Sequence, residues 1–143
     1  MTEGWHGDEY LVLLSDDEVA PMTSQYELGN FLPGFQLVGL RGWDDFIVRD
    51  GHGKLFTAQT IPLDAQNLKP LETSIDTRSI RPDDQLSGRV KWYIKPLIFG
   101  GDPQAKDNMI WLNFQQHAEA VRWWNQKYLE AKHASISTRN PNS

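Results

Sequence analysis

The stretch GNFLPGFQLVGLRGWDDFIVRDGHGKLF, residues 29–56, decides the fold because apolar runs alternate with turn signals along it. Apolar runs at residues 35–40, 46–48 and 55–58 predict three strands. The last two runs face each other across a short turn. We therefore expect them to pair as a hairpin.

The turn RDGHGK between these two runs supports the hairpin. Its Asp50-Gly51 pair and its second glycine, Gly53, are expected to supply the positive φ angles that a tight turn requires. Pro62 lacks a backbone N–H, so the pairing is expected to end before it.

Three further apolar segments predict strands outside this stretch. YLVLL at residues 10–14 is a compact apolar run, short enough for a strand with both faces covered. RVKWYI at residues 89–94 alternates Val90, Trp92 and Ile94 with polar or aromatic residues. Residues 109–112 form another short apolar segment after a Gly-Gly-Asp-Pro turn.

A short helix is expected after the first of these strands. Ser15 and Glu18 have the spacing of a capping box, and the acidic residues between them suit the first turn of a helix. Pro21 is expected either to keep this helix short or to move its start to about Met22.

Residues 65–88 are polar and read as a long connection, although Leu68, Leu71 and Ile75 have the spacing of a short helical face. After it, a longer helix is predicted near the C-terminus. Four of its apolar residues fall on one side, with His117 and Trp124 at the margin: Phe114, Ala118, Val121 and Tyr128. This side is expected to pack on the core, and residues 132–143 are expected to form a flexible tail.

Two residues of this helix depart from the simple pattern. Asn125 projects into the apolar face, so its amide is expected to bind a neighbouring backbone segment, for which the Gly-Gly-Asp turn at residues 100–102 is the candidate. Trp123 points away from the core side. Either the 65–88 connection covers it, which we favour, or it is an exposed apolar contact.

Composition narrows the classes of function. The chain has 143 residues, of which 39% are hydrophobic and 11% aromatic, and this is typical of one folded domain. Its net charge of −5 argues against general nucleic-acid binding and favours a basic partner. No membrane span or signal-peptide pattern is visible, so a cytoplasmic location is expected. The absence of cysteine excludes disulfides and thiolate metal sites.

No motif for a cofactor, a metal ion or a nucleophile is visible, so neither a cofactor nor catalysis is expected. The adjacent Asp44 and Asp45 are expected to diverge to opposite faces of an extended segment, which disfavours a two-carboxylate acid and base pair. The alternative that stays open is a hydrolase that uses Asp44 or Asp45 with His52.

The order of several short motifs resembles the SUKH superfamily. They are GDEYLVLL, a tyrosine before a Pro-Gly strand, a Gly-Trp-Asp-Asp segment, a strand that ends in aspartate, a glycine turn and KLFTAQTIPLD. The resemblance covers residues 7 to about 64. The positions that carry it are Gly7, Asp8, Tyr10, Tyr26, Pro33, Gly34, Gly39, Gly42, Asp45, Asp50 and Pro62.

This resemblance implies an α+β domain with a central, mostly antiparallel sheet and flanking helices. It would occupy residues 1–131, with a C-terminal extension from about residue 89. It also implies an immunity protein that binds and neutralises a cognate bacterial toxin, often a nuclease, and the acidic net charge would suit a basic one.

Charge and aromatic content then select the residues expected to contact the toxin. The leading set is Arg41, Trp43, Asp44 and Asp45, and the second is Asp83, Asp84 and Trp123. For Trp43, packing in the core is an equal alternative. A regulatory or scaffolding domain that binds a host protein or a small ligand is the alternative function. A homodimer is expected if the sheet leaves an N-terminal edge open.

Overall fold

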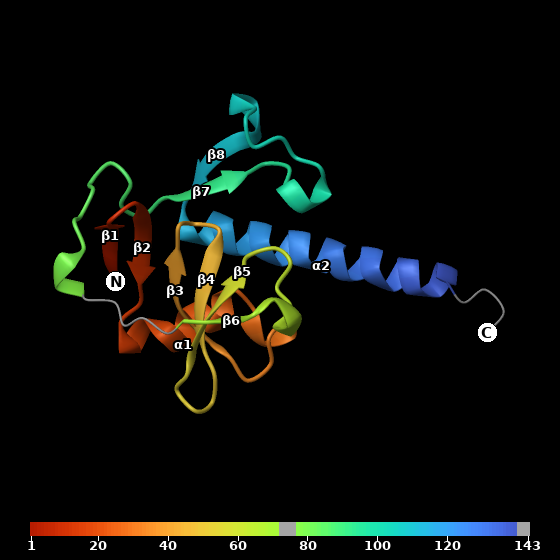
Figure 1. Ribbon diagram of the computed structural model, residues 1–143, viewed down its shortest axis with the longest axis horizontal. Coiled ribbons are helices and arrows are strands. Elements are labelled where there is room, and N and C mark those ends of the chain that lie inside the picture. The colour runs from red at the N-terminus through yellow and green to blue at the C-terminus, as the bar shows by residue number, and fades with distance from the viewer. Residues whose placement is uncertain (72–76, 140–143) are drawn as a thin grey trace.

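The structure is a computed structural model that describes residues 1–71 and 77–139, with side chains described as far as His133. It has the expected α+β architecture (Figure 1). Six strands form one antiparallel sheet whose spatial order is the order of the sequence: β1 Thr2–His6, β2 Glu9–Leu13, β3 Gln36–Arg41, β4 Asp45–Arg49, β5 Leu55–Gln59 and β6 Lys69–Pro70.

The strands and the hairpin predicted within residues 29–56 are confirmed as β3, β4 and β5. In the β4–β5 turn the Asp50 carboxylate accepts bonds from the backbone N–H groups of His52 and Lys54, each at 2.9 Å. Gly53 has φ +84°, as predicted, whereas Gly51 does not have a positive φ. The side chain of Asp50 therefore stabilises a turn that needs only one left-handed glycine.

The helix α1, Asp16–Gln25, begins where the capping box predicts it. The backbone N–H of Ser15 donates to Glu18 Oε1 at 2.9 Å. Pro21 lies inside this helix, so the prediction that it shifts the start to Met22 is wrong. The other alternative, a short helix, is what the structure has. Pro21 is the sixth of ten residues, and its ring removes one N–H that would otherwise bond within the helix.

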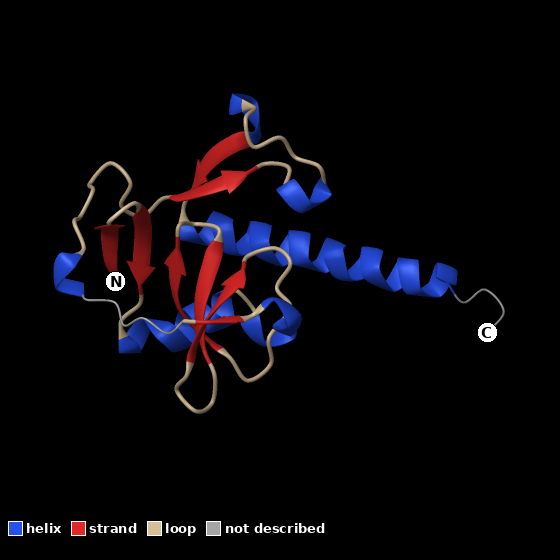
Figure 2. Cartoon of the chain, in the orientation of Figure 1, coloured by secondary structure: helices blue, strands red, loops and turns tan. Residues whose placement is uncertain are grey.

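A two-stranded ribbon and a long helix follow the main sheet. The ribbon pairs β7, Val90–Tyr93, with β8, Met109–Leu112, and α2 spans Phe114–Arg139. Figure 2 shows the ribbon set apart from the six-stranded sheet, beside the first turns of α2. The helix continues past Lys132 into the predicted tail, because no proline or glycine interrupts the chain before residue 141.

Five short 3-10 helices complete the described chain: η1 Leu28–Asn30, η2 Ala65–Asn67, η3 Thr77–Ser79, η4 Leu97–Phe99 and η5 Lys106–Asn108. The predicted helical face in the 65–88 connection is wrong for Leu68 and Leu71. Leu68 follows η2 with an extended backbone, and Leu71 follows β6 and donates its N–H to Leu55 O at 3.0 Å. Ile75 lies outside the described residues.

The main core lies between one face of the sheet, η1 and α2. Alternation in β2 and β4 points Tyr10, Val12, Phe46 and Val48 to this face, where Ala118 and Val121 of α2 meet them. The prediction that the apolar side of α2 packs on the core is confirmed.

Asn125 of α2 binds a backbone segment as predicted, but the segment is a different one. Its Oδ1 accepts from Leu63 N at 2.7 Å, and its Nδ2 donates to Thr60 O and Val121 O, each at 2.8 Å. The residue thus fixes residues 60–63, which include the cis Ile61–Pro62 bond, and not the Gly-Gly-Asp turn.

The N-terminal edge of the sheet is bridged near the end of β1. Trp5 of β1 exchanges backbone hydrogen bonds with Arg81, at 2.8 and 2.9 Å. Gly4 permits this contact, because a Cβ there would lie 2.3 Å from Arg81 O. The edge at which we expected self-pairing is therefore partly occupied by the chain itself, at Trp5.

Candidate functional site

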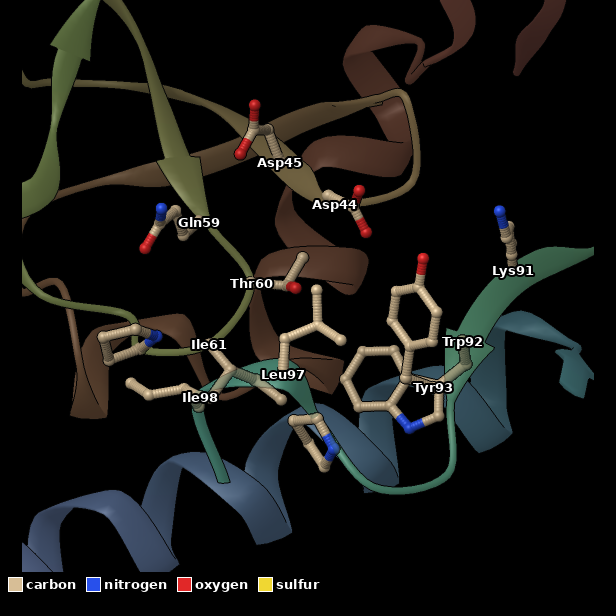
Figure 3. Close-up of a pocket in the computed structure, with 12 residues that line it drawn as sticks. Asp44, Asp45, Gln59, Thr60, Ile61, Lys91, Trp92, Tyr93, Leu97 and Ile98 are labelled. Carbon is tan, nitrogen blue, oxygen red and sulfur yellow. The ribbon is translucent and has the colours of Figure 1, made fainter. Parts of the chain in front are cut away.

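An open pocket of about 400 Å³ lies between the start of β4, the segment after β5, and β7 with the turn that follows it. Figure 3 shows the side chains that line it. Two walls are apolar and one end is acidic. The lining residues are Asp44, Asp45, Gln59, Thr60, Ile61, Pro62, Lys91, Trp92, Tyr93, Pro96, Leu97 and Ile98.

The β3–β4 turn sets the position of Asp44 in this pocket. Gly42 and Trp43 both adopt left-handed backbone conformations, with φ of +60° and +62°. This conformation is unusual for a bulky side chain and is maintained by surrounding contacts. One of them is the bond from Thr60 N to Asp44 O, at 3.0 Å, which ties the turn to the chain after β5.

Asp44 and Asp45 line the same pocket but point apart. Asp45 begins β4 and lies across from Gln59 of β5, whereas Asp44 points toward Lys91 and Tyr93 of β7 (Figure 3). The expected divergence is therefore visible, although it does not carry the two residues into separate sites. The two carboxylates are available as two separate anionic contacts.

The pocket raises the pKa of both aspartates. Desolvation is the main cause for Asp44, whose pKa is raised further by Asp45 and lowered by Lys91. Desolvation also raises the pKa of Asp45, against the opposing effect of Arg41 and Lys69. Among the described residues neither carboxylate accepts a hydrogen bond or forms an ion pair. Their negative charge therefore lacks a close partner.

Arg41, in the leading contact set, already has a partner. Its Nε and one terminal nitrogen donate to the two carboxylate oxygens of Glu9, each at 2.9 Å. This bidentate geometry lowers the pKa of Glu9. Arg41 thus borders the acidic end of the pocket without neutralising either aspartate directly.

Trp43 is half-buried in an aromatic cluster, consistent with the packing alternative. Its ring stacks on Tyr10, with centroids 5.0 Å apart, and contacts Trp5 and Trp111 edge to face at 5.9 and 5.3 Å. Trp111 belongs to β8, so this cluster joins the ribbon to the main sheet. The indole N–H of Trp43 is buried and has no hydrogen-bond partner.

The second set of predicted contacts is not gathered at this pocket. Asp83 accepts the indole N–H of Trp5 at 3.1 Å beside β1, and Asp84 is exposed in the same loop. Trp123 lies on α2 against Trp124, with Lys127 over its ring. The prediction that the 65–88 connection covers Trp123 is wrong, since this side chain is 54% exposed.

The proposed pairing of a carboxylate with His52 is also absent. Asp45 and Arg49 mark the two ends of β4, and His52 lies in the turn beyond Arg49. Five strand residues place those ends roughly 13 Å apart. Within the described residues no group of acidic residues and histidines is arranged to hold a metal ion.

Several pocket residues were missed at the sequence level. Lys91 and Tyr93 had a usable signal, because the alternation that sends Val90 and Trp92 to the core sends these two to the other side. For Leu97 and Ile98 the sequence contained no such signal. Their place depends on how the turn after β7 packs beside residues 60–62.

In the part of the chain that the structure describes, neither helix has an apolar stretch long enough to cross a membrane. No family model, curated protein or solved structure matches the chain.

Proposed function

We propose that the protein binds a basic partner protein through the pocket and the surface around it, and that this partner is a toxin which the protein neutralises. The carrying observation is the position of Asp44 and Asp45, two carboxylates without ion pairs at the end of a pocket with apolar walls. An immunity role is what the SUKH-like order of motifs implies, and a cytoplasmic location would suit it.

The pocket is suited to a lysine or arginine side chain of the partner. Its apolar walls, which include Pro62, Leu97 and Ile98, would accept the methylene stem, while the aspartates would bind the charged end. Asp45 is half-buried, whereas Asp44 is exposed at the edge of the pocket. A cation that enters would therefore meet Asp45 at a reduced desolvation cost and reach Asp44 directly from solvent.

The same geometry favours binding over catalysis. The two carboxylates point apart (Figure 3), and His52 lies beyond the far end of β4. An acid and base mechanism would require two groups directed at one reacting bond.

The test is co-expression with the protein encoded by the neighbouring open reading frame. We expect that protein to stop growth alone, and co-expression to restore growth through a complex seen by size-exclusion chromatography. The variant Asp44→Lys/Asp45→Lys should fold but lose protection, with affinity reduced at least about 30-fold, the equivalent of ~2 kcal/mol.

The matched control is Asp107→Lys/Glu130→Lys, which makes the same change in net charge at exposed positions outside the pocket. It should keep protection. Equal loss in both variants would assign the effect to net charge, and full protection by the pocket variant would eliminate the pocket as the binding site. A neighbouring protein that is harmless and forms no complex would remove the toxin proposal itself.

A further inference from the structure

Lys91 of β7 is a half-buried lysine without an anionic partner. The other six lysines are exposed, and two of them, Lys127 and Lys132, form ion pairs with Glu130 and Asp64. Lys91 forms no ion pair with any residue that the structure describes. A lysine that is partly removed from water ordinarily has a counter-charge, because its ammonium group loses hydration. The lysine that most needs an anionic partner is therefore the one that lacks it.

Tyr93 orients the Lys91 side chain without neutralising its charge. The two residues lie on the same face of β7, because side chains alternate along a strand. The Nζ atom of Lys91 lies over the Tyr93 ring, 5.8 Å from its centroid, and both side chains line the acidic pocket. The aromatic ring attracts the ammonium group but carries no net charge. The positive charge of Lys91 is therefore available to a molecule that enters the pocket.

The pocket thus contains negative and positive groups that are neighbours but not partners. Asp44 points toward Lys91 (Figure 3), yet the two form no ion pair. Desolvation raises the pKa of both aspartates, and the opposing cation is Lys91 for Asp44 but Arg41 and Lys69 for Asp45. Asp44 therefore lies nearer than Asp45 to the positive end of the pocket. A single basic side chain would match only the negative end.

We propose that Lys91 determines the specificity of this pocket by binding an aspartate or glutamate side chain that the partner presents beside its basic one. The inference rests on the proposed function, since it requires that the partner protein enters this pocket. The basic side chain of the partner would lie between Asp44 and Asp45, and its acidic side chain would lie against Lys91. Charges of opposite sign then alternate across the interface.

Lys91 would also select against segments that are only basic. A lysine or arginine that approached Asp44 from the side of β7 would meet the positive charge of Lys91. Like charges brought together in an interface weaken binding and thereby exclude wrong partners. Attraction to the net charge of −5 alone would not make this distinction. An acidic residue at the matching position of the partner turns the same repulsion into attraction.

The test is the sign of the change in affinity when Lys91 loses its charge. Dissociation constants are measured by isothermal titration calorimetry with the purified protein of the neighbouring open reading frame. Lys91→Met makes the net charge more negative, so attraction to a basic partner alone would tighten binding. We expect the opposite, a loss of about tenfold for Lys91→Met and a larger loss for Lys91→Glu. Lys91→Arg retains the charge and should bind within about threefold of the wild type.

Lys54 provides the matched control, because it lies over an aromatic ring in the same way but outside the pocket. Its Nζ atom is 5.3 Å from the centroid of the Phe56 ring, again two residues farther along the chain. Lys54→Met and Lys54→Glu make the same changes in net charge beside the β4–β5 turn. Binding by these variants should be unchanged or slightly tighter. Circular dichroism and thermal melting establish that each variant is folded.

A charge swap then identifies the acidic residue of the partner. We substitute lysine singly for the aspartates and glutamates of the neighbouring protein. One of these substitutions should restore binding to Lys91→Glu while it weakens binding to the wild type.

Tighter or unchanged binding by Lys91→Met overturns the proposal, as does an equal loss from Lys54→Met or the absence of any restoring substitution. If Asp44→Lys/Asp45→Lys nevertheless abolishes binding in the same experiment, the proposed function stands and only the role of Lys91 fails. A neighbouring protein that forms no complex with the wild type removes both.

Discussion

The six-stranded sheet and the region formed by the ribbon and α2 differ in how far their apolar side chains are exposed. Residues 1–89 carry 15 acidic and 7 basic side chains, and every large hydrophobic side chain that the structure describes there, except Met1, is buried or half-buried. Residues 90–143 carry 4 acidic and 7 basic side chains and contain every other exposed large hydrophobic residue described: Ile94, Leu97, Ile98, Met109, Ile110 and Trp123. The buried apolar residues of the first region thus lie in a core that α2 helps to form, whereas the second region leaves several of its own apolar side chains exposed.

The acidic pocket lies where the two regions meet. Asp44 and Asp45 come from the sheet, and Lys91, Tyr93, Leu97 and Ile98 come from the ribbon and the turn that follows it. Charge is therefore contributed mainly by one region and apolar surface mainly by the other. A partner that enters the pocket would contact both regions at once.

Asn125 gives the largest expected effect, because it holds the two regions together. Replacement by alanine leaves the backbone N–H of Leu63 and the carbonyl of Thr60 without their buried partners. We expect the free energy of unfolding to fall by about 3 kcal/mol, measured by urea denaturation. The neighbouring Gln126→Ala, at an exposed position, should change it by less than about 0.5 kcal/mol. Equal effects of the two variants would contradict the assigned role.

How much of this structure could be predicted depends on how far apart the interacting residues lie in the sequence. Local alternation and the Asp50 turn were sufficient for β3 to β5, and helical periodicity was sufficient for α2. The capping box located the start of α1, whereas Pro21 alone could not decide between a short helix, which the structure has, and a later start.

Strand β1 was not predicted although its partner β2 is adjacent in the sequence. Contacts between distant residues account for much of the rest that was missed. The need of Asn125 for a partner was visible in the sequence, but its partners Thr60 and Leu63 lie more than 60 positions away. Closure of the β1 edge by Arg81 depends on another distant contact. The two aspartates of the pocket were predicted as site residues, but the wall from Leu97 and Ile98 required the packing between the two regions.

His117 makes the core of the sheet region sensitive to acid. Its side chain is fully buried, with Nδ1 2.6 Å from the Tyr26 hydroxyl, and burial lowers the pKa of His117 to about 3, from 6.5. Below pH 6.5 this histidine is protonated in the unfolded chain, whereas in the folded chain it stays neutral until the pH approaches 3. This contribution is therefore complete above pH 6.5 and is lost as the pH falls toward 3, at about 1.4 kcal/mol per pH unit.

We expect a loss of about 2 to 3 kcal/mol between pH 6.5 and 4.5 from this histidine, followed by urea denaturation across that range. The variant Tyr26→Phe/His117→Phe removes both hydrogen-bonding partners together and with them this part of the pH dependence. If its stability falls with pH as steeply as that of the wild type, other groups cause the acid sensitivity.

The smallest expected effect on global stability comes from Gly101→Ala, in the turn after β7. This substitution tests whether the second region opens independently of the first. A Cβ at Gly101 would lie 1.8 Å from Lys95 O, so Gly101→Ala must displace this turn, in which Gly101 N donates to Pro96 O at 3.0 Å. Because few buried contacts join the turn to the main core, we expect the global free energy of unfolding to change by about 1 kcal/mol or less. Hydrogen exchange should nevertheless accelerate strongly at the amides of Gly100 and Gly101, while the amide of Val48 in β4 stays protected.

In the sheet, Gly39→Ala places a Cβ 2.4 Å from Val12 O and should destabilise the whole domain instead. A global loss of the same size from both substitutions would mean that the two regions unfold as one unit, and the contrast between a closed sheet and an independently open ribbon would then fail.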